Sequence, residues 1–442
     1  MQWRVSLPPM FPEIISNRED NMKKKNLIMA AAILTVALLA GCGKEGTVTT
    51  EVSSSKTTVS STSKKETSVS STSKEEKAST ESSVSKETDT SSADIENKEE
   101  IIVYRQKVFD LFSGMTIGWN LGNTLDSHGA GNSLRSETYW GNPKVTPELF
   151  AAVKEQGFNT VRIPVTWAEH LGAAPDYKIN EEWLNRVKEI VDYAVDLDLY
   201  IILDTHHETD FWLKTKPENA EALKSELAAL WTQIAETFKD YNEKLIFEGL
   251  NEPRLKGSAR EWNGGTPDER KLVNDLNRTF IDAVRATGGN NEERCLIICT
   301  YGHCAEDQAL KDLEIPADPN IAVAVHMYTP YFFTYEAQGS YSNWNGTHKS
   351  DISNIVKLLK KYFLDKGIPV IITETGAVYK ENSEEIVKWI NDYFGIMDEA
   401  GIKCAVWDNG IFRGQGERFG VINRSTYNWN DESIANAYTN RK

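Results

Sequence analysis

Positive charge is scarce in this sequence. Its 49 Lys and Arg residues are outnumbered by 65 Asp and Glu residues, which gives a formal net charge of −16 at pH 7. Proteins that bind nucleic acid need a basic face to neutralise phosphates, so this balance argues against a nucleic-acid partner. The acidic excess is most simply explained as a contribution to solubility.

Cysteine is also scarce, with five residues in the chain of 442. The sequence has no Cys-x-x-Cys pair and no Cys/His spacing of the kind that holds zinc. Cys295 and Cys299 lie four residues apart within an apolar run, and we expect free buried thiols there rather than a disulfide. The thiol states of Cys304 and Cys404 are left open. Nothing in the sequence resembles a glycine-rich nucleotide loop.

The N-terminal apolar run, Leu27 to Ala40, is too short to span a bilayer, which needs roughly 20 residues. The basic segment Lys23-Lys24-Lys25 precedes it, and Leu39-Ala40-Gly41-Cys42 ends it. This order is typical of a secretory signal. The Leu-Ala-Gly-Cys end resembles the lipobox of bacterial lipoproteins, and the resemblance implies cleavage before Cys42 and lipid attachment to it. A simple signal peptide with an incidental cysteine is the alternative.

These features divide the chain into four parts. Residues 1–21 precede the signal as an upstream extension, and we expect translation to start at Met22. Residues 22–41 would be the lipoprotein signal peptide. Residues 42–100 are dominated by Ser, Thr, Lys and Glu and hold too little apolar surface to offset chain entropy, so we expect a disordered linker. Residues 101–442 form the folded domain. The expected location is extracellular, with the chain tethered to the cell surface only through the lipid on Cys42.

Short apolar runs alternate with amphipathic segments throughout the folded domain. Continuous runs of this kind are typical of parallel strands that are buried on both faces. Eight such alternations favour a (β/α)8 TIM barrel, an α/β fold, although a doubly wound sheet remains possible. The eight runs are Met115–Trp119, Thr160–Pro164, Tyr200–His206, Leu245–Leu250, Cys295–Tyr301, Ile321–Tyr328, Pro369–Thr373 and Cys404–Asp408.

Helix-end signals separate several of the runs. Asn180 can cap a segment with an apolar stripe from Trp183 to Ala194. Thr146-Pro147 predicts the start of another helix, with Gly157 just past its end. A third helix is predicted from Ser383 to Ala400, and Gly401 would be its C-cap.

Polar residues stand where the predicted strands end, and in a TIM barrel the chemistry is found at that rim. Glu252 follows the fourth run and Glu374 follows the seventh, so the two would face each other across the barrel. Glycoside hydrolysis needs such a pair, one carboxyl to protonate the leaving oxygen and one to attack or to activate water. Their pKa values must differ, and Arg162 could be the cation that lowers the pKa of Glu374.

The residues around these glutamates resemble a known family. The segment 245–254, which contains Asn251-Glu252-Pro253-Arg254, is similar to the signature of glycoside hydrolase family 5. The resemblance runs from about Val103 to the C-terminus. Three further segments resemble its subfamily 4, which is known for endo-β-1,4-glucanases that often also act on xyloglucan and mixed-linkage glucan: Gly118–Asp126, Tyr139–Pro143 and Val161–Trp167.

The resemblance implies a retaining mechanism and a role for each matched residue. Glu252 would be the acid/base and Glu374 the nucleophile. The two carboxylates would lie about 5–5.5 Å apart. No metal and no organic cofactor would be needed. The implied substrate-binding residues are Arg162 and Tyr328 for orienting the nucleophile, Asn251 for the sugar 2-hydroxyl, His206 and His326 for the reacting subsite, Trp407 as a sugar platform, and His207, Asn123, Trp140 and Asn409 as further lining.

Two departures from the family pattern affect the reacting subsite. Thr373 precedes the nucleophile where glycine is common, and Met327 stands where an aromatic residue is often found. The expected substrate is a β-glucan and the expected oligomeric state is a monomer. Xyloglucanase, mannanase and xylanase activity are alternatives within the enzyme class. A non-catalytic surface glycan-binding protein on the same barrel is the alternative from another class, and the presence of both glutamates weighs against it.

Overall fold

The computed structural model describes residues 105–441. The predicted upstream extension, the predicted signal peptide with Cys42 after it, and the predicted linker all lie outside the described residues, as do residues 101–104. Among the described residues, no helix combines the length and apolar character needed to cross a membrane.

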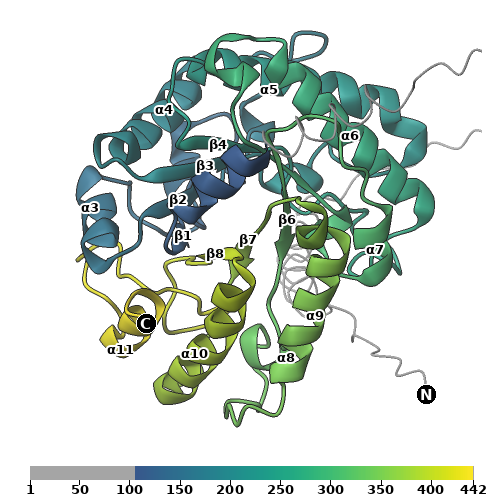
Figure 1. Ribbon diagram of the computed structural model, residues 1–442. Coiled ribbons are helices and arrows are strands. Elements are labelled where there is room, and N and C mark those ends of the chain that lie inside the picture. Colours follow the sequence, from purple (N-terminus) through teal and green to yellow (C-terminus); the bar gives the residue numbers. More distant parts are fainter. Residues whose placement is uncertain (1–104, 442) are drawn as a thin grey trace, which may run out of the picture. The chain divides into compact units, whose positions relative to one another are not determined.

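Eight parallel strands form a closed barrel in the order β1 to β8, with β1 paired to β8 (Figure 1). The predicted TIM barrel is therefore confirmed, and each of the eight apolar runs overlaps one strand. Glycine is required at the closing seam, because a Cβ on Gly118 would lie 2.7 Å from the Cβ of Ala405. The strands are β1 (Gly118–Asn120), β2 (Thr160–Ile163), β3 (Tyr200–Asp204), β4 (Leu245–Glu248), β5 (Leu296–Cys299), β6 (Ile321–His326), β7 (Val370–Thr375) and β8 (Lys403–Val406).

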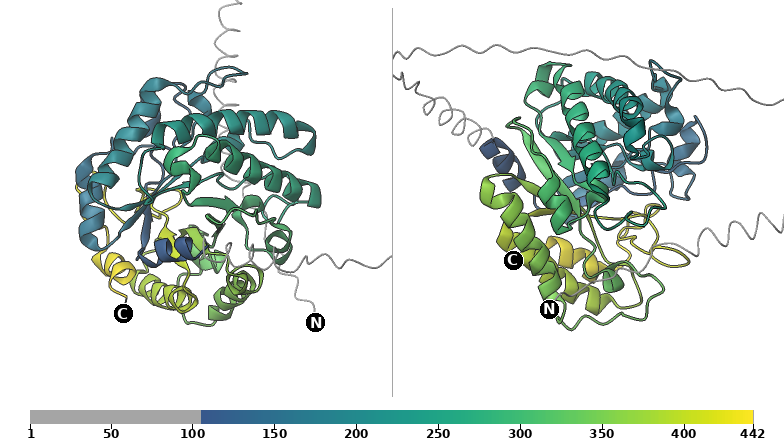
Figure 2. Two further views of the ribbon diagram at one scale, coloured as in Figure 1. Left: turned by 45° about the horizontal axis from the view of Figure 1, so that its top comes forward. Right: turned by 90° about the vertical axis from the view of Figure 1, so that its right-hand side faces the viewer.

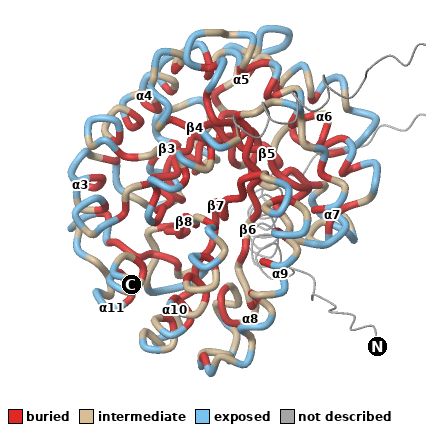
Figure 3. Tube along the Cα trace, viewed as in Figure 1, coloured by how far each residue is buried: buried red, intermediate tan, exposed pale blue. Residues whose placement is uncertain are grey.

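Helices surround the strands in all views (Figures 1 and 2). The sides of the helices that face the strands are buried and their outer sides are exposed, while nearly all strand residues are buried (Figure 3). The helices are α3 (Pro147–Gln156), α4 (Glu181–Asp196), α5 (Ala220–Phe238), α6 (Pro267–Arg285), α7 (Asp307–Asp312), α8 (Tyr331–Thr334), α9 (Lys349–Tyr362), α10 (Ser383–Ala400) and α11 (Glu432–Thr439).

The predicted helix ends are confirmed. The Asn180 side chain accepts hydrogen bonds from the backbone of Glu182 and Trp183 at the start of α4. Pro147 is the first residue of α3, and Gly157 ends that helix with φ 115°. Gly401 ends α10 with φ 70°. Both glycines adopt the left-handed conformation that side chains disfavour.

The first strand begins later than predicted, at Gly118 instead of Met115. Met115 instead packs with Val108 and Phe112 of the helical segment 105–113. This segment contacts inward-facing strand residues such as Ile202 and Ile297. It therefore closes the barrel at the end opposite the polar strand ends. The Cys295 and Cys299 thiols are free and buried as expected, and Cys304 and Cys404 are free as well.

Candidate active site

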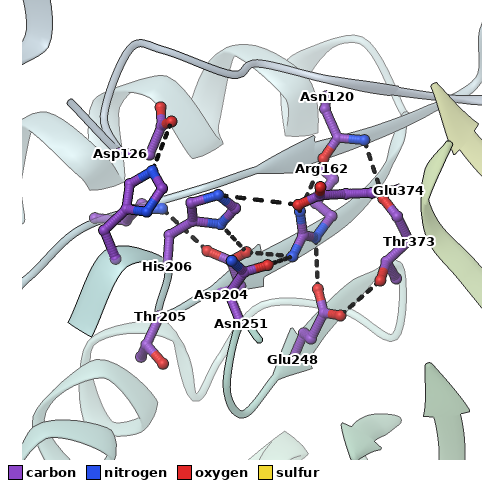
Figure 4. Close-up of polar contacts among 12 residues, drawn as sticks. Asn120, Asp126, Arg162, Asp204, Thr205, His206, Glu248, Asn251, Thr373 and Glu374 are labelled. Carbon is purple, nitrogen blue, oxygen red and sulfur yellow. Dashed lines mark hydrogen bonds and ion pairs between the residues drawn. The ribbon is translucent and has the colours of Figure 1, made fainter. Parts of the chain in front are cut away.

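The carboxyl-terminal ends of the strands bring polar side chains to one side of the barrel, which we call the barrel mouth. Arg162 of β2 lies at its centre and is fully buried. A buried guanidinium is stable only when its donors and its charge are matched. The residues around it are Asn120 of β1, Asp204 at the end of β3, Glu248 and Asn251 at the end of β4, and Glu374 of β7 (Figure 4).

Arg162 uses all three of its nitrogens. Its Nε donates to Glu248 at 2.5 Å, and Nη1 donates to Asn120 at 3.0 Å and to Glu374 at 2.7 Å. Its Nη2 donates to Asn251 at 2.9 Å and forms an ion pair with Asp204 at 2.6 Å. One cation thus contacts three carboxylates. We call Arg162 together with Asp204, Glu248 and Glu374 the guanidinium cluster.

The cluster carries more negative than positive charge, and the pKa values reflect this. Burial raises the pKa of Asp204 to about 7 against the attraction of Arg162. Burial also opposes ionisation of Glu248, but Arg162 and the hydrogen bond from His303 prevail and hold the pKa of Glu248 well below its usual range. Glu248 is therefore the carboxylate that balances the guanidinium most directly.

Glu374 lies on β7 with its side chain only 7% exposed. Its Oε1 accepts from Arg162, and its Oε2 accepts from the Tyr328 hydroxyl at 3.0 Å. His206 Nε2 lies 3.9 Å from Oε1, and His326 Nδ1 lies 3.5 Å from Oε2. The two contacts predicted for this carboxylate, from Arg162 and Tyr328, are thus present.

The pKa of Glu374 differs from the sequence-based expectation. Arg162 does lower it, as expected, but burial is the larger effect and the Glu252 carboxylate adds to it, so the pKa rises to about 8. The sequence indicated that Arg162 would lie near Glu374, but it did not indicate how deeply Glu374 is buried. The contacts from Arg162 and Tyr328 are consequently those that favour the ionised form of this residue.

Glu252 is more accessible, with 20% of its side chain exposed. Its Oε1 lies 3.0 Å from His326 Nδ1, and its Oε2 lies 3.2 Å from Arg254. One oxygen of Glu252 and one of Glu374 lie within 4.8 Å of each other. The two predicted catalytic carboxyls therefore meet at the barrel mouth in different environments, one beside a fully buried cation and one partly open to solvent.

Three predicted binding residues lie next to this pair. Arg162 donates to the Asn251 oxygen, which leaves the amide NH2 group for other partners. The His206 ring stacks on Trp407, with centroids 5.6 Å apart and planes at 3°. Glycine at position 122 makes room for Trp407, because a Cβ there would lie 2.6 Å from the indole.

The remaining predicted lining residues lie further out. His207 contacts Trp140, with ring centroids 5.4 Å apart, and its Nε2 lies 3.6 Å from Asp126. Asn123 has a left-handed backbone with φ 54° and is partly exposed. Asn409 is buried and its side chain is used within its own loop, where it donates to the Glu417 carbonyl and accepts from the Ile411 N–H. That engagement favours a structural role for Asn409.

The structure also resolves the two departures from the family pattern. The Thr373 hydroxyl donates to Glu248 at 2.8 Å and so supports the guanidinium cluster. Met327 is buried and takes part through its backbone, which donates to the Glu374 carbonyl at 3.0 Å. Neither side chain removes a contact from the two catalytic candidates.

Sequence reasoning missed two residues that complete the site, Glu248 and His303. Glu248 lies inside an apolar run, and a charge in a buried strand is itself a signal that a buried cation must be near. His303 follows β5 and contacts both Glu248 and the backbone of Glu252. Its position two residues beyond a predicted strand was the available signal.

Comparison with known proteins agrees with this geometry. The family described as cellulase (glycosyl hydrolase family 5) matches residues 124–413. Endoglucanase A of Ruminococcus albus is 48% identical over 333 residues, which cover 74% of this chain and 91% of that protein. A xyloglucan-specific endo-β-1,4-glucanase from a metagenomic library, solved with cellotriose, is 63% identical and superposes with a TM-score of 0.75 over 76% of this chain and 99% of its own.

A broad-specificity GH5-4 endoglucanase from Ruminococcus champanellensis, also solved with cellotriose, is 42% identical with a TM-score of 0.73. That match covers 75% of this chain and 97% of the other. The barrel, the glutamate after β4, the glutamate on β7 and the matching relatives lead to one conclusion: the chain is a glycoside hydrolase and belongs to the cellulases of glycosyl hydrolase family 5.

Proposed function

We propose that this endo-β-1,4-glucanase cleaves internal bonds of β-glucans by double displacement, with Glu374 as the nucleophile and Glu252 as the acid/base. The observation that carries the proposal is that one oxygen of Glu252 and one oxygen of Glu374 lie within 4.8 Å of each other. Retaining glycosidases keep their carboxyls about 5–5.5 Å apart, whereas inverting enzymes need about 6.5–9.5 Å to admit a water. The short separation therefore favours retention.

The first step forms a bond between Glu374 and the anomeric carbon while the glycosidic bond breaks. Glu252 gives its proton to the departing oxygen and is left as a carboxylate, and its partly exposed position gives water access to it. Water then attacks the glycosyl-enzyme from the side of Glu252, which takes the proton back. The product keeps the β configuration, and Glu374 returns to a carboxylate beside Arg162.

The relatives and Asn251 support a proposal about the finer substrate class. The xyloglucan-specific enzyme shares 63% of its residues with this chain, so we propose that xyloglucan is a substrate alongside unbranched β-1,4-glucan. The Asn251 amide NH2, fixed by the bond from Arg162 to its oxygen, suits an equatorial 2-hydroxyl. Mannose carries that hydroxyl in the axial position and would lose the contact.

A panel of polysaccharides tests this assignment. We expect kcat/KM on xyloglucan to equal or exceed that on carboxymethyl cellulose, and activity on mannan to be lower by about 100-fold, because a missing polar contact discriminates strongly. Reducing-sugar release at matched substrate concentrations is the measurement, with xylan and mixed-linkage glucan included. Mannan or xylan as the best substrate would contradict the assignment. An absence of sugar release from every substrate would favour a glycan-binding role.

We also propose that the enzyme is a cell-surface lipoprotein attached through Cys42. The basic segment, apolar run and Leu39-Ala40-Gly41-Cys42 motif support this proposal. The full chain, expressed in a bacterium that processes lipoproteins, should partition into the detergent phase of Triton X-114, and the Cys42→Ala variant should remain in the aqueous phase. Equal partitioning of the two proteins would refute the lipid anchor.

A further inference from the structure

The backbone of Glu252 adopts a conformation that side chains disfavour. Its φ is 44°, in the left-handed region where residues other than glycine are uncommon. Such a conformation persists only when the surroundings hold it, and it is often found where a side chain must be aimed. The contacts that hold the Glu252 backbone therefore decide where its carboxyl points.

Two side chains hold this backbone. The Glu252 N–H donates to His303 Nδ1 at 2.9 Å, and the Glu252 carbonyl accepts from Arg254 Nη1 at 2.9 Å. His303 is fully buried after β5 and itself has a left-handed backbone, with φ 52°. The peptide group of the acid/base candidate is thus hydrogen-bonded to a histidine in the segment that follows β5, the neighbouring strand.

The chemistry of the imidazole fixes what each ring nitrogen does. A backbone N–H can only donate, so His303 Nδ1 must accept and must carry no proton. The ring proton of the neutral histidine then sits on Nε2, which lies 3.1 Å from Glu248 Oε1 and donates to it. Glu248 in turn accepts from Arg162 Nε. One ring therefore connects the Glu252 backbone to the guanidinium cluster.

A second histidine holds the other end of the same residue. His326 Nδ1 lies 3.0 Å from the Glu252 carboxylate, and its ring stacks on His303 with centroids 4.1 Å apart. The backbone of Glu252 is consequently held by the His303 ring and its carboxyl by the His326 ring, and these two rings stack on each other. A shift of His303 would therefore move both ends.

We propose that His303 is a positioning residue that orients the Glu252 carboxyl toward the glycosidic oxygen. It does so through Nδ1, which stays free of a proton because the ring proton is held on Nε2 by its hydrogen bond to Glu248 of the guanidinium cluster. This inference rests on the proposed role of Glu252 as the acid/base. His303 does not touch the reacting atoms. Its loss should weaken proton donation selectively, and attack by Glu374 should be retained.

Two aryl cellobiosides separate these effects. Phenyl β-cellobioside has a poor leaving group that needs a proton, whereas 2,4-dinitrophenyl β-cellobioside leaves without one. For both, kcat/KM reports the first bond cleavage. A variant that is merely less folded loses activity equally on both substrates, whereas a misaimed acid loses it mainly on the phenyl substrate.

Two substitutions at His303 separate its contact with Glu252 from its contact with Glu248. In His303→Asn the amide oxygen takes the place of Nδ1 and can still accept from Glu252, but the side chain is too short to reach Glu248. In His303→Gln the amide nitrogen takes the place of Nε2 and can still reach Glu248, but the acceptor for Glu252 is gone. We expect the Gln variant to lose about 10- to 100-fold on the phenyl substrate and less than about threefold on the dinitrophenyl substrate.

The Asn variant should keep the ratio of the two kcat/KM values within about threefold of wild type. Thr373→Val, which removes the other hydrogen bond to Glu248 Oε1 and leaves Glu252 untouched, should also keep that ratio. Equal losses on both substrates in the Gln variant, or an Asn variant as selective as the Gln variant, would overturn the inference.

Glu252→Ala serves as the reference that separates this inference from the proposed function. If Glu252 is the acid/base, its removal should lower the phenyl rate by about 10²- to 10⁴-fold while sparing the dinitrophenyl rate. Selectivity in Glu252→Ala but not in His303→Gln would reject the positioning role alone. No selectivity in Glu252→Ala would reject the assignment of the acid/base itself.

Discussion

Replacing Glu374 by glutamine should lower kcat on β-1,4-glucan by about 10⁴-fold or more, the scale seen when an enzyme loses its nucleophile. The amide is nearly isosteric, and its oxygen can still accept from Arg162, so the fold should be kept. What disappears is the charge that attacks the anomeric carbon. The measurement is single-turnover and steady-state hydrolysis of cello-oligosaccharides, with circular dichroism to confirm folding.

Azide distinguishes this role from that of Glu252. In Glu374→Ala, azide fits the vacated space and attacks from the same side, so an activated β-cellobioside should yield the α-glycosyl azide. In Glu252→Ala the glycosyl-enzyme still forms, and azide then attacks from the opposite side to give the β-glycosyl azide. NMR of the anomeric proton identifies each product. Exchanged products would mean that the two roles are exchanged, and full activity in Glu374→Gln would reject the nucleophile.

Replacing Arg162 by methionine should lower the free energy of unfolding by about 3–5 kcal/mol, because it leaves buried carboxylates without their cation. Asp204, Glu248 and Glu374 all contact this guanidinium, and no other Lys or Arg among the described residues forms an ion pair with any of them. Denaturant unfolding near neutral pH measures the loss. Arg162→Lys is the matched control, since it keeps the charge but offers fewer donors in a different geometry.

The decrease in the free energy of unfolding caused by Arg162→Met should also depend on pH. A carboxyl whose pKa is raised in the folded state binds a proton there that the unfolded chain has released, so stability falls as pH rises between the two pKa values. For Asp204 and Glu374 that interval runs from 3.8 and 4.5 to about 7 and 8. Removing the cation raises these pKa values further. Below about pH 7 both folded proteins keep these protons, so the destabilisation of Arg162→Met by these two carboxyls should grow only as pH rises above about 7 to 8, and an equal loss at about pH 6 and about pH 9 would contradict the proposed electrostatics.

Much of the fold could be predicted because its signals are local. Apolar runs marked each strand, and Asn180, Pro147 and Gly401 marked helix ends through their own backbone chemistry. The late start of β1 could not be predicted, because it depends on Met115 packing against a helix that crosses the floor of the barrel.

The site was predictable only in part for a similar reason. Glu252 and Glu374 stand at strand ends in recognisable motifs, so their facing positions followed from the barrel. The role of His303 depends on which ring nitrogen meets a particular peptide group, and no spacing encodes that. The raised pKa of Glu374 depends on the depth of burial, which only the packed structure reveals.

The guanidinium cluster bears on how inactive members of such a lineage would look. Arg162 joins residues from β1, β3, β4 and β7, so selection for a stable barrel alone would preserve it after catalysis was lost. Glu252 is partly exposed and supports no comparable set of partners, so drift would remove it first. The presence of this arginine in a related sequence therefore indicates a stable barrel, whereas the presence of the glutamate after β4 is the better indicator of activity.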